Sequence, residues 1–208
     1  MNQQNNRLSK SDKTSLEAQK KGRVVIVSGP SGVGKSTVCS QVVKRLENVY
    51  LSISVTTRPI GRTEVDGRDY CFVSKQRFQQ QIDRGLLLEH AKVFGNFYGT
   101  PRDKVDEALN AGKTVILEID VQGAKQVRAV YPDAVMIFIL PPTRKELAKR
   151  MNGRAREEQK AAEERLDGAG TEIAAAWQYY KYMVINDNLE QAVNEVVEII
   201  QQAVGEKE

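Results

Sequence analysis

The amino-acid sequence predicts an α/β fold, a parallel β-sheet flanked by helices, from two kinds of observation. Val24–Val27, Val115–Leu117 and Ala134–Leu140 are unbroken apolar runs, as expected of strands buried on both faces of a parallel sheet. Segments with the periodicity of amphipathic helices separate these runs, and strands that alternate with helices are typical of parallel sheets. The chain of 208 residues is long enough for one such domain with a substantial core.

The composition is that of an ordinary globular protein and limits the classes of partner. Hydrophobic residues make up 40% of the chain and charged residues 28%, and the formal net charge of +4 favours anionic ligands. Basic residues do not form a block with interleaved aromatics, so we expect no nucleic-acid partner. No apolar run approaches the roughly 18 residues of a membrane span, so we expect no membrane partner. Cys39 and Cys71 have neither metal nor redox spacing, which favours a cytoplasmic location.

Two parts of different character follow one another along the chain. Residues 1–21 are rich in Asn, Gln, Ser and Lys, and we expect a flexible polar tail because so few apolar groups cannot offset the entropy of ordering. This segment also lacks the apolar core of a secretory signal. Residues 22–208 are expected to form the domain, as a monomer or a homodimer, between which the sequence does not decide.

The domain begins with the strongest motif of the sequence. Residues 29–36 match the phosphate-loop pattern G-x-x-x-x-G-K-[ST] in full, just after the strand Val24–Val27. Closely spaced glycines let backbone N–H groups surround a polyphosphate, and the following helix adds its positive N-terminal end. The motif predicts a fold of the P-loop NTPase type that binds a nucleoside triphosphate. The residues expected to contact the triphosphate are Gly29, Pro30, Ser31, Gly32, Val33, Gly34, Lys35, Ser36 and Thr37.

Two residues of this loop have distinct expected roles. Lys35 is placed to bridge the β- and γ-phosphates, and Ser36 to offer its hydroxyl oxygen to Mg²⁺. The alternative is a glycine-rich turn that only links a strand to a helix. The apolar positions Val38, Val42 and Leu46 continue directly as an amphipathic helix, which favours the phosphate loop.

The middle of the chain does not continue the alternation of strands and helices. A short strand Tyr50–Val55 ends near Pro59, and a polar loop rich in turn residues follows. The elements expected after this loop are a strand at 71–73, a helix at 75–84 that Ser74 caps, and a hairpin that pairs 87–94 with 97–99. We expect residues of about 54–100 to form a small mixed β-rich lobe that faces the phosphate loop.

The last part of the chain returns to the parallel pattern. The elements expected there are helices at 102–111 and 123–130, strands at 115–120, 134–140 and 184–187, and a closing helix at 189–204. Glu118 and Asp120 end an apolar strand and, being two residues apart, are expected to share one of its faces. Within a charged helical segment of about 144–176, Gly168 and Gly170 are expected to break or kink the helix.

Four stretches outside the phosphate loop narrow the prediction further. Ser52–Arg58, Gly67–Tyr70, Gly95–Thr100 and Glu118–Gly123 together resemble the motifs of guanylate kinases, and the resemblance extends from about Gly22 to the C-terminus. It implies a transferase that phosphorylates GMP or dGMP with ATP, within purine nucleotide metabolism. ATP and GMP are then the expected small-molecule partners, and Mg²⁺ the expected cofactor.

The resemblance also implies how the base of the acceptor is held. The residues at Ser54 and Glu89 are those that touch guanine in the family, with Thr100 beside them and Asp120 near the guanine amino group. The chemistry agrees, because a carboxylate can accept from both the N1–H and the amino group of guanine. Adenine offers no such pair of donors, so a buried carboxylate would be left unpaired against it.

The monophosphate is expected to bind Arg58, Tyr70 and Tyr98. The planar fork of an arginine suits phosphate oxygens, and tyrosine hydroxyls add neutral donors. The family usually has a second arginine three residues after the first, where this chain has Gly61 with Arg62 one place later. Arg62 is therefore an expected ligand only if the loop shifts to bring it to the phosphate, and the alternative is a missing contact.

The charged segment resembles the lid of the family, whose arginines close over the phosphates during transfer. Arg150, Arg154 and Arg165, together with Lys35, are the expected catalytic residues. The alternative is a solvated helix face on which these arginines pair with neighbouring glutamates.

Mg²⁺ is expected to bind Ser36 directly and to bind Glu118 and Asp120 through water. Acidic residues that merely end a strand are the alternative, but acids in this position in a chain with a phosphate loop favour the neighbourhood of the metal.

Two other functions stay open at this point. A kinase on the same scaffold could use a different phosphorylated acceptor, although the combination of Ser54, Glu89 and Thr100 favours GMP. A non-catalytic guanylate-kinase-like binding module is the second possibility, although such modules tend to lose the phosphate loop, which is complete here.

Overall fold

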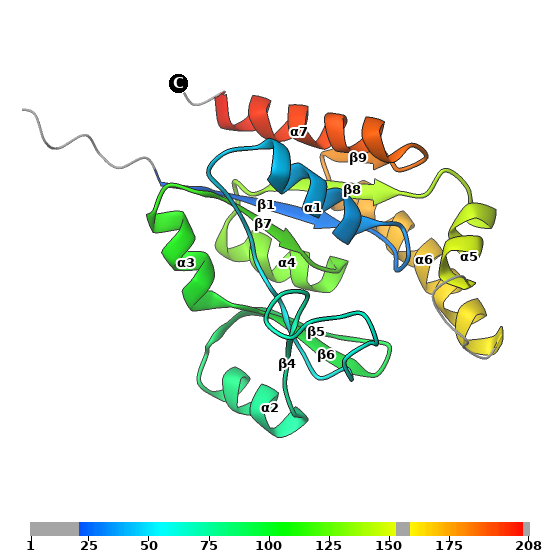
Figure 1. Cartoon of the computed structure of the whole chain (residues 1–208), viewed down its shortest axis with the longest axis horizontal. Helices are drawn as coiled ribbons and strands as arrows, with labels where there is room; N and C mark the ends of the chain where they lie inside the picture. The colour runs from blue at the N-terminus through cyan, green and yellow to red at the C-terminus, as the bar shows by residue number, and fades with distance from the viewer. Residues whose placement is uncertain (1–20, 153–158, 206–208) are drawn as a thin grey trace, which may run out of the picture.

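The computed structural model describes residues 21–152 and 159–205, and its elements confirm the predicted α/β class (Figure 1). Within this part of the chain a central sheet of five parallel strands has the order β2-β7-β1-β8-β9. These strands are β2 (Val49–Leu51), β7 (Thr114–Glu118), β1 (Arg23–Ser28), β8 (Val135–Leu140) and β9 (Tyr182–Ile185). Because β1 is the middle strand, the loop that follows it lies at the centre of the carboxyl edge of the sheet, where α/β proteins place their ligands.

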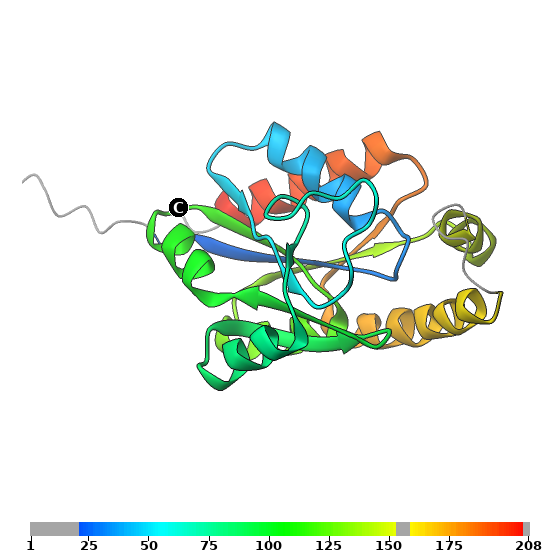
Figure 2. The ribbon, with the colours of Figure 1, turned by 60° about the horizontal axis from the view of Figure 1, so that its bottom comes forward.

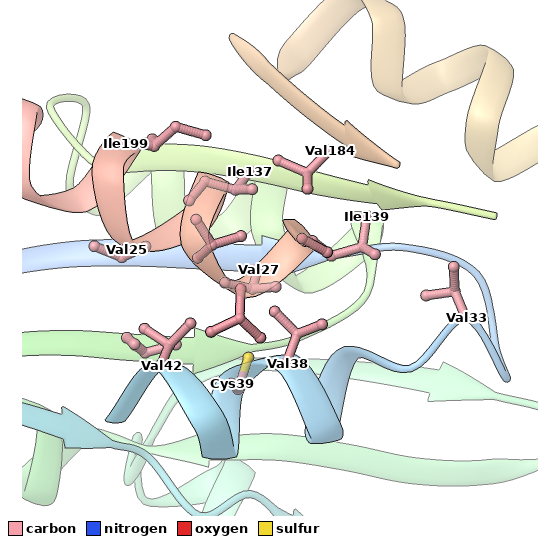
Figure 3. Close-up of a cluster of buried hydrophobic side chains, with 14 of the residues drawn as sticks. Val25, Val27, Val33, Val38, Cys39, Val42, Ile137, Ile139, Val184 and Ile199 are labelled. Atoms are coloured by element: carbon pink, nitrogen blue, oxygen red, sulfur yellow. The ribbon is translucent and has the colours of Figure 1, made fainter. Parts of the chain in front are cut away.

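The alternation of side chains along β1 divides the core into two layers. Val25 and Val27 belong to one buried cluster, and Val24 and Ile26 belong to the other. The first layer is covered by α1 (Lys35–Arg45) and α7 (Leu189–Gly205), and Figure 3 shows Val38, Cys39 and Val42 of α1 within it. The second layer is covered by α3 (Arg102–Asn110), α4 (Val121–Val130) and the C-terminal part of α6 (Gln159–Tyr179), on the opposite face of the sheet (Figures 1 and 2).

A second, smaller sheet is built from the residues between β2 and α3. Its strand order is β4-β3-β6-β5, with β3 (Val55–Thr56), β4 (Cys71–Phe72), β5 (Leu87–Val93) and β6 (Asn96–Pro101). β5 and β6 form the predicted antiparallel hairpin, whereas β3 pairs in parallel with β4, so the sheet is mixed. Helix α2 (Lys75–Asp83) inserts Phe78 into a separate small core with Val55 and Leu87. The second sheet thus has a core of its own.

Two expectations about single elements are wrong. Residues 50–55 do not form one strand: the N–H of Ser52 still donates to the carbonyl of Ile116 at 3.0 Å, but Val55 already pairs with Gly99 in the second sheet. Helix α6 runs through Gly168 and Gly170 without a break. Each glycine costs about 1 kcal/mol against alanine in a helix, and burial of the apolar face of α6 against the core outweighs this cost.

The expected division of the chain into tail, lobe and lid stays a prediction. Residues 1–20 lie outside the described part of the chain, as does Arg154. The helix α5 (Arg144–Asn152), which follows β8, belongs to the region of the expected lid. Among the helices within residues 21–152 and 159–205, none is both long and apolar enough to cross a membrane.

Candidate active site

The phosphate loop joins β1 to α1 and takes its shape from three glycines. Gly29, Gly32 and Gly34 have φ angles of 152°, 79° and 102°, which residues other than glycine rarely adopt. Gly34 is also the N-cap of α1, so the loop leads directly into the N-terminal turn, whose free N–H groups attract anions. The fully buried side chain of Val33 fixes the loop to the core (Figure 3). The backbone of this loop is therefore shaped to receive phosphate groups.

The ammonium group of Lys35 lies against its own loop. Its Nζ donates to the carbonyl oxygen of Gly29 at 2.6 Å and to that of Pro30 at 3.1 Å. A positive charge is thus held at the point where the backbone curves around the expected phosphates.

Ser36 meets an acidic residue from the neighbouring strand. Its Oγ donates to Oε1 of Glu118 at 2.7 Å, because Glu118 ends β7 beside Val27 of β1. Hydroxyl and carboxylate oxygens are ligands of the kind that Mg²⁺ prefers. Across residues 21–152 and 159–205, no group of three or more His, Cys, Asp and Glu side chains could hold a metal ion. The oxygens of Ser36 and Glu118 could thus contribute to the binding of a metal that also binds the phosphates of a nucleotide.

Asp120 has a different position from the expected one. The strand ends at Glu118, and Asp120 is instead the N-cap of α4, so the two carboxylates do not share a strand face. Its Oδ1 accepts from the N–H of Gly123 at 2.9 Å, and its Oδ2 accepts from Nε2 of Gln122 at 2.9 Å. Asp120 therefore fixes the start of the helix that faces the second sheet.

Arg150 lies on the other side of the phosphate loop. It donates through Nε to Oε1 of Glu146 at 3.2 Å and through Nη1 to the carbonyl of Asn186 at 2.9 Å. The side chain of Asn186 in turn donates to the carbonyl of Val33 at 2.9 Å. Asn186, the residue that follows β9, thus connects the phosphate loop to α5.

A pocket of about 260 Å³ lies at this junction. The residues that line it are Gly32, Val33, Gly34, Thr37, Arg150, Asn186, Asp187 and Leu189. Asn186, Asp187 and Leu189 were not expected in the site from the sequence. The signal that could have found Asn186 and Asp187 is polar residues directly after an apolar strand, the same signal that singled out Glu118 and Asp120.

The other two expected lid arginines have no described side chains. Arg154 lies outside the described residues, and Arg165 is described only as part of the backbone of α6. Their roles stay predictions.

Two residues after β3, Arg58 lies among aromatic rings and an acidic partner. Its guanidinium lies 5.3 Å from the ring centre of Tyr70 and 5.5 Å from that of Phe72. Its Nη1 and Nη2 donate to Oε2 and Oε1 of Glu64 at 2.8 and 2.7 Å. The hydrogen bonds between these two groups raise the pKa of Arg58 and lower the pKa of Glu64. The rings of Tyr70 and Tyr98 meet edge-on, with 6.0 Å between their centres. The structure therefore brings Arg58, Tyr70 and Tyr98 together.

Glu64 is a further residue of this group and was not expected there from the sequence. Its Oε2 also accepts from the N–H of Gly61 at 2.6 Å, so it shapes the loop that carries Arg62. Arg62 itself is exposed, and its role as a phosphate ligand stays a prediction. The signal that could have found Glu64 is its spacing from Arg58 along the chain.

Glu89 is almost completely buried beside Thr100. Their exposed fractions are 3% and 1%, and Oγ1 of Thr100 donates to Oε1 of Glu89 at 2.7 Å. Burial raises the pKa of Glu89 to about 7, and the charge of Asp120 adds to this shift, whereas the hydrogen bond from Thr100 opposes it. Ser54 is half-buried where the chain enters the second sheet, and its carbonyl accepts from the N–H of Cys71 at 2.9 Å.

The carboxylate of Glu89 lies directly against the first turn of α4. A side chain at Gly123 would overlap both its Oε2 and its carboxyl carbon, and would come within 3.4 Å of Oδ1 of Asp120. Gly123 therefore permits the contact between α4 and Glu89, a role that its place in the sequence motif did not reveal. Because α4 follows β7, and β7 pairs with the strand that leads into the phosphate loop, Glu89 and the phosphate loop are tied to the same part of the central sheet.

A five-stranded parallel sheet with a complete phosphate loop at its carboxyl edge defines a P-loop protein that binds nucleotides. Comparison with known proteins identifies the family. The family model described as guanylate kinase matches residues 21–203. The chain therefore belongs to the guanylate kinase family.

Individual relatives agree with this assignment. The guanylate kinase of Carboxydothermus hydrogenoformans is 44% identical over 180 residues, which cover 86% of this chain and 88% of the relative. That of Synechocystis sp. is 44% identical over 197 residues, which cover 95% of this chain and 98% of the relative. The crystal structure of guanylate kinase from Anaplasma phagocytophilum superposes with a TM-score of 0.74 at 34% identity, over 88% of this chain and 87% of that one.

Proposed function

We propose that the protein is an ATP-dependent guanylate kinase, which transfers the γ-phosphoryl group of ATP to GMP or dGMP and releases ADP and GDP or dGDP. The observation that carries this proposal is the buried carboxylate of Glu89, bonded to Thr100, in a chain with a complete phosphate loop. A buried carboxylate needs donors, and guanine supplies an adjacent pair of them, its N1–H and its amino group, whereas adenine has no such pair.

The acceptor phosphate is expected at Arg58, Tyr70 and Tyr98. Glu64 accepts from both terminal nitrogens of Arg58, and the carbonyl of Pro59 accepts from Nη1. A phosphate would therefore bind the remaining N–H groups of the guanidinium or displace the carboxylate. The acceptor needs no general base, since the second pKa of a phosphate monoester is about 6 and its oxygens are ionised at neutral pH.

The donor is expected to lie along the phosphate loop, with its adenosine in the pocket of about 260 Å³ beside Thr37. Lys35 would exchange the carbonyls of Gly29 and Pro30 for phosphate oxygens, and Arg150 would approach from α5. Positively charged groups fixed around the transferring phosphoryl group stabilise its transition state. Arg154 and Arg165 are proposed to join them on the basis of the family resemblance.

The residues near the phosphate loop suit Mg²⁺. Ser36 and Glu118 offer two oxygen donors within 2.7 Å of each other, and Asp120 follows two residues later. Ser36 is proposed to hold the ion directly, with Glu118 and Asp120 contacting it through water. When bound, Mg²⁺ would neutralise charge between the phosphate groups of the donor.

The test is ADP release from ATP and Mg²⁺ in a coupled assay with GMP, dGMP, AMP, UMP and CMP as acceptors. We expect strong turnover with GMP and dGMP, loss of turnover in Lys35→Ala, and a weakened preference for GMP over AMP in Glu89→Gln. Turnover with a different acceptor alone would indicate another kinase of this scaffold. Measurable GMP binding without any turnover would indicate a binding module.

A further inference from the structure

One side chain outside the residues considered so far joins α4 to the strand that carries Glu89. Nε2 of Gln126 donates to the carbonyl of His90 at 2.7 Å, and Oε1 of Gln126 accepts from the N–H of His90 at 3.2 Å. A carboxamide carries both a donor and an acceptor without a charge, so it can satisfy both main-chain groups of one residue. His90 directly follows Glu89, so these two bonds fix the backbone beside the buried carboxylate.

The position of β5 in its sheet explains why this contact matters. β5 is an edge strand that pairs with β6 on one side only. The N–H and C=O groups on the free side of an edge strand have no partner strand. Gln126 takes the place of such a partner at His90, whereas the side chain of His90 itself is exposed. The free edge of β5 is therefore attached to α4 at this residue.

Gly123 lies one turn before Gln126 on the same helix and against the carboxylate of Glu89. The helix thus meets the strand twice, once at the side chain of Glu89 and once at the main chain of the next residue. Asp120, which caps α4, fixes the start of the helix. Thr100 holds the carboxylate from the opposite strand.

We propose that Gln126 is a positioning residue for recognition of the acceptor base, which holds β5 on α4 so that the carboxylate of Glu89 meets both donors of guanine. This inference rests on the proposed role of Glu89. Two simultaneous hydrogen bonds to a planar base tolerate little displacement, because hydrogen bonds weaken steeply with misalignment. Without the attachment, the edge strand can shift while its hairpin partner stays in place, and the preference for guanine falls.

The decisive variant is Gln126→Met, which keeps the length of the side chain and removes both hydrogen bonds. Steady-state kinetics with GMP and with AMP are compared between this variant and the wild-type protein. We expect the KM for GMP to rise and the ratio of kcat/KM for GMP to that for AMP to fall, each by about tenfold. The KM for ATP and the kcat at saturating GMP are expected to stay within about twofold, because the phosphate loop is not involved.

Two further variants separate positioning from simple loss of stability. Val127→Ala lies on the same helix and removes two methyl groups from a fully buried side chain, so it lowers Tm while the hydrogen bonds between Gln126 and His90 stay in place. We expect it to keep the GMP-to-AMP ratio. Gln126→Glu keeps the acceptor for the N–H of His90 but, when ionised, has no donor for its carbonyl, so an intermediate ratio is expected.

The outcomes distinguish this inference from the proposed function. A wild-type protein that does not prefer GMP over AMP would overturn both. A wild-type protein that prefers GMP, with an unchanged ratio in Gln126→Met, would overturn the role of Gln126 alone. An equal loss of ratio in Val127→Ala would also overturn it, because the effect would then follow stability.

Discussion

Arg58 and Glu64 form an ion pair with two parallel hydrogen bonds, 2.8 and 2.7 Å long, in which both side chains are about a quarter exposed. Bidentate pairs of this kind depend on the planar fork of arginine. The same guanidinium is expected to bind the acceptor phosphate, so Glu64 and the phosphate would share its five N–H donors.

Replacement of Arg58 by lysine tests this role. Lysine keeps the charge but loses the fork and the stacking over Tyr70 and Phe72. We expect the KM for GMP to rise by about tenfold or more with little change in the KM for ATP. The matched control is Arg68→Lys, whose guanidinium pairs with Asp69 in the same region at 2.8 Å but is 64% exposed. Equal effects of the two substitutions would count against Arg58 as the phosphate ligand.

The hydrogen bond between Ser36 and Glu118 predicts how the reaction depends on Mg²⁺. Ser36→Ala removes the hydroxyl oxygen at the phosphate loop, and Glu118→Gln removes the neighbouring charge. We expect each substitution to raise the Mg²⁺ concentration needed for half-maximal activity, on the order of tenfold. Ser40→Ala, on the same helix, removes only a hydrogen bond to the carbonyl of Thr37 and serves as the control. Unchanged Mg²⁺ titrations in both site variants would contradict the assignment.

The raised pKa of Glu89 predicts a pH dependence of acceptor binding. Guanine donates to the ionised carboxylate, so kcat/KM for GMP is expected to increase as the pH rises through about 7, the pKa to which burial raises this group. For folding the sign is opposite. The folded state binds the proton more tightly than the unfolded state, so the stability that Glu89 contributes is present below its ordinary pKa and lost as the pH rises through about 7.

The measurement is a pH profile of kcat/KM for GMP in the wild-type protein and in two variants. In Glu89→Gln the step near pH 7 should disappear, leaving the ionisation of the GMP phosphate near a pKa of about 6. Glu172→Gln is the control, since burial also raises the pKa of Glu172 on α6 to about 7. If the step followed Glu172 instead, the pH dependence would belong to α6 rather than to base recognition.

Replacement of glycine by alanine is expected to change the free energy of unfolding in opposite directions at Gly123 and Gly168. Gly123→Ala places a methyl group against the carboxylate of Glu89, so we expect a loss of about 1–3 kcal/mol in the free energy of unfolding and a higher KM for GMP. Gly168→Ala lies in α6 with no atom within 4 Å of the added carbon, so a gain of about 0.5–1 kcal/mol is expected. Denaturant unfolding of both variants checks these signs.

The sequence was sufficient to predict the parts of the fold whose signals are local. β1, β7 and β8 are unbroken apolar runs, and the phosphate loop is one continuous pattern, so neither depends on distant residues. The break between β2 and β3 could not be predicted, because it depends on Ile116 and Gly99 as pairing partners. Local composition shows nothing of either partner.

The site shows the same division. The spacing of Gly29, Lys35 and Ser36 marks a function by itself, whereas Asn186 reaches the phosphate loop across 153 residues and Gln126 reaches β5 across 36. Contacts at such separations are set by how the sheets and helices pack. The apolar residues from Val115 to Ile119 predict a strand that includes Asp120, whereas β7 ends at Glu118 and Asp120 caps α4.

The bonds from Lys35 to the carbonyls of Gly29 and Pro30 have a thermodynamic consequence for nucleotide binding. The loop is shaped by its own lysine and by the buried Val33, so its backbone entropy is lost during folding and not when a ligand arrives. When a triphosphate binds, its phosphate oxygens replace the carbonyl oxygens of Gly29 and Pro30 as the acceptors of the Lys35 ammonium group. Binding to such a preorganised loop is expected to be fast and to leave the backbone of residues 29–34 almost unmoved.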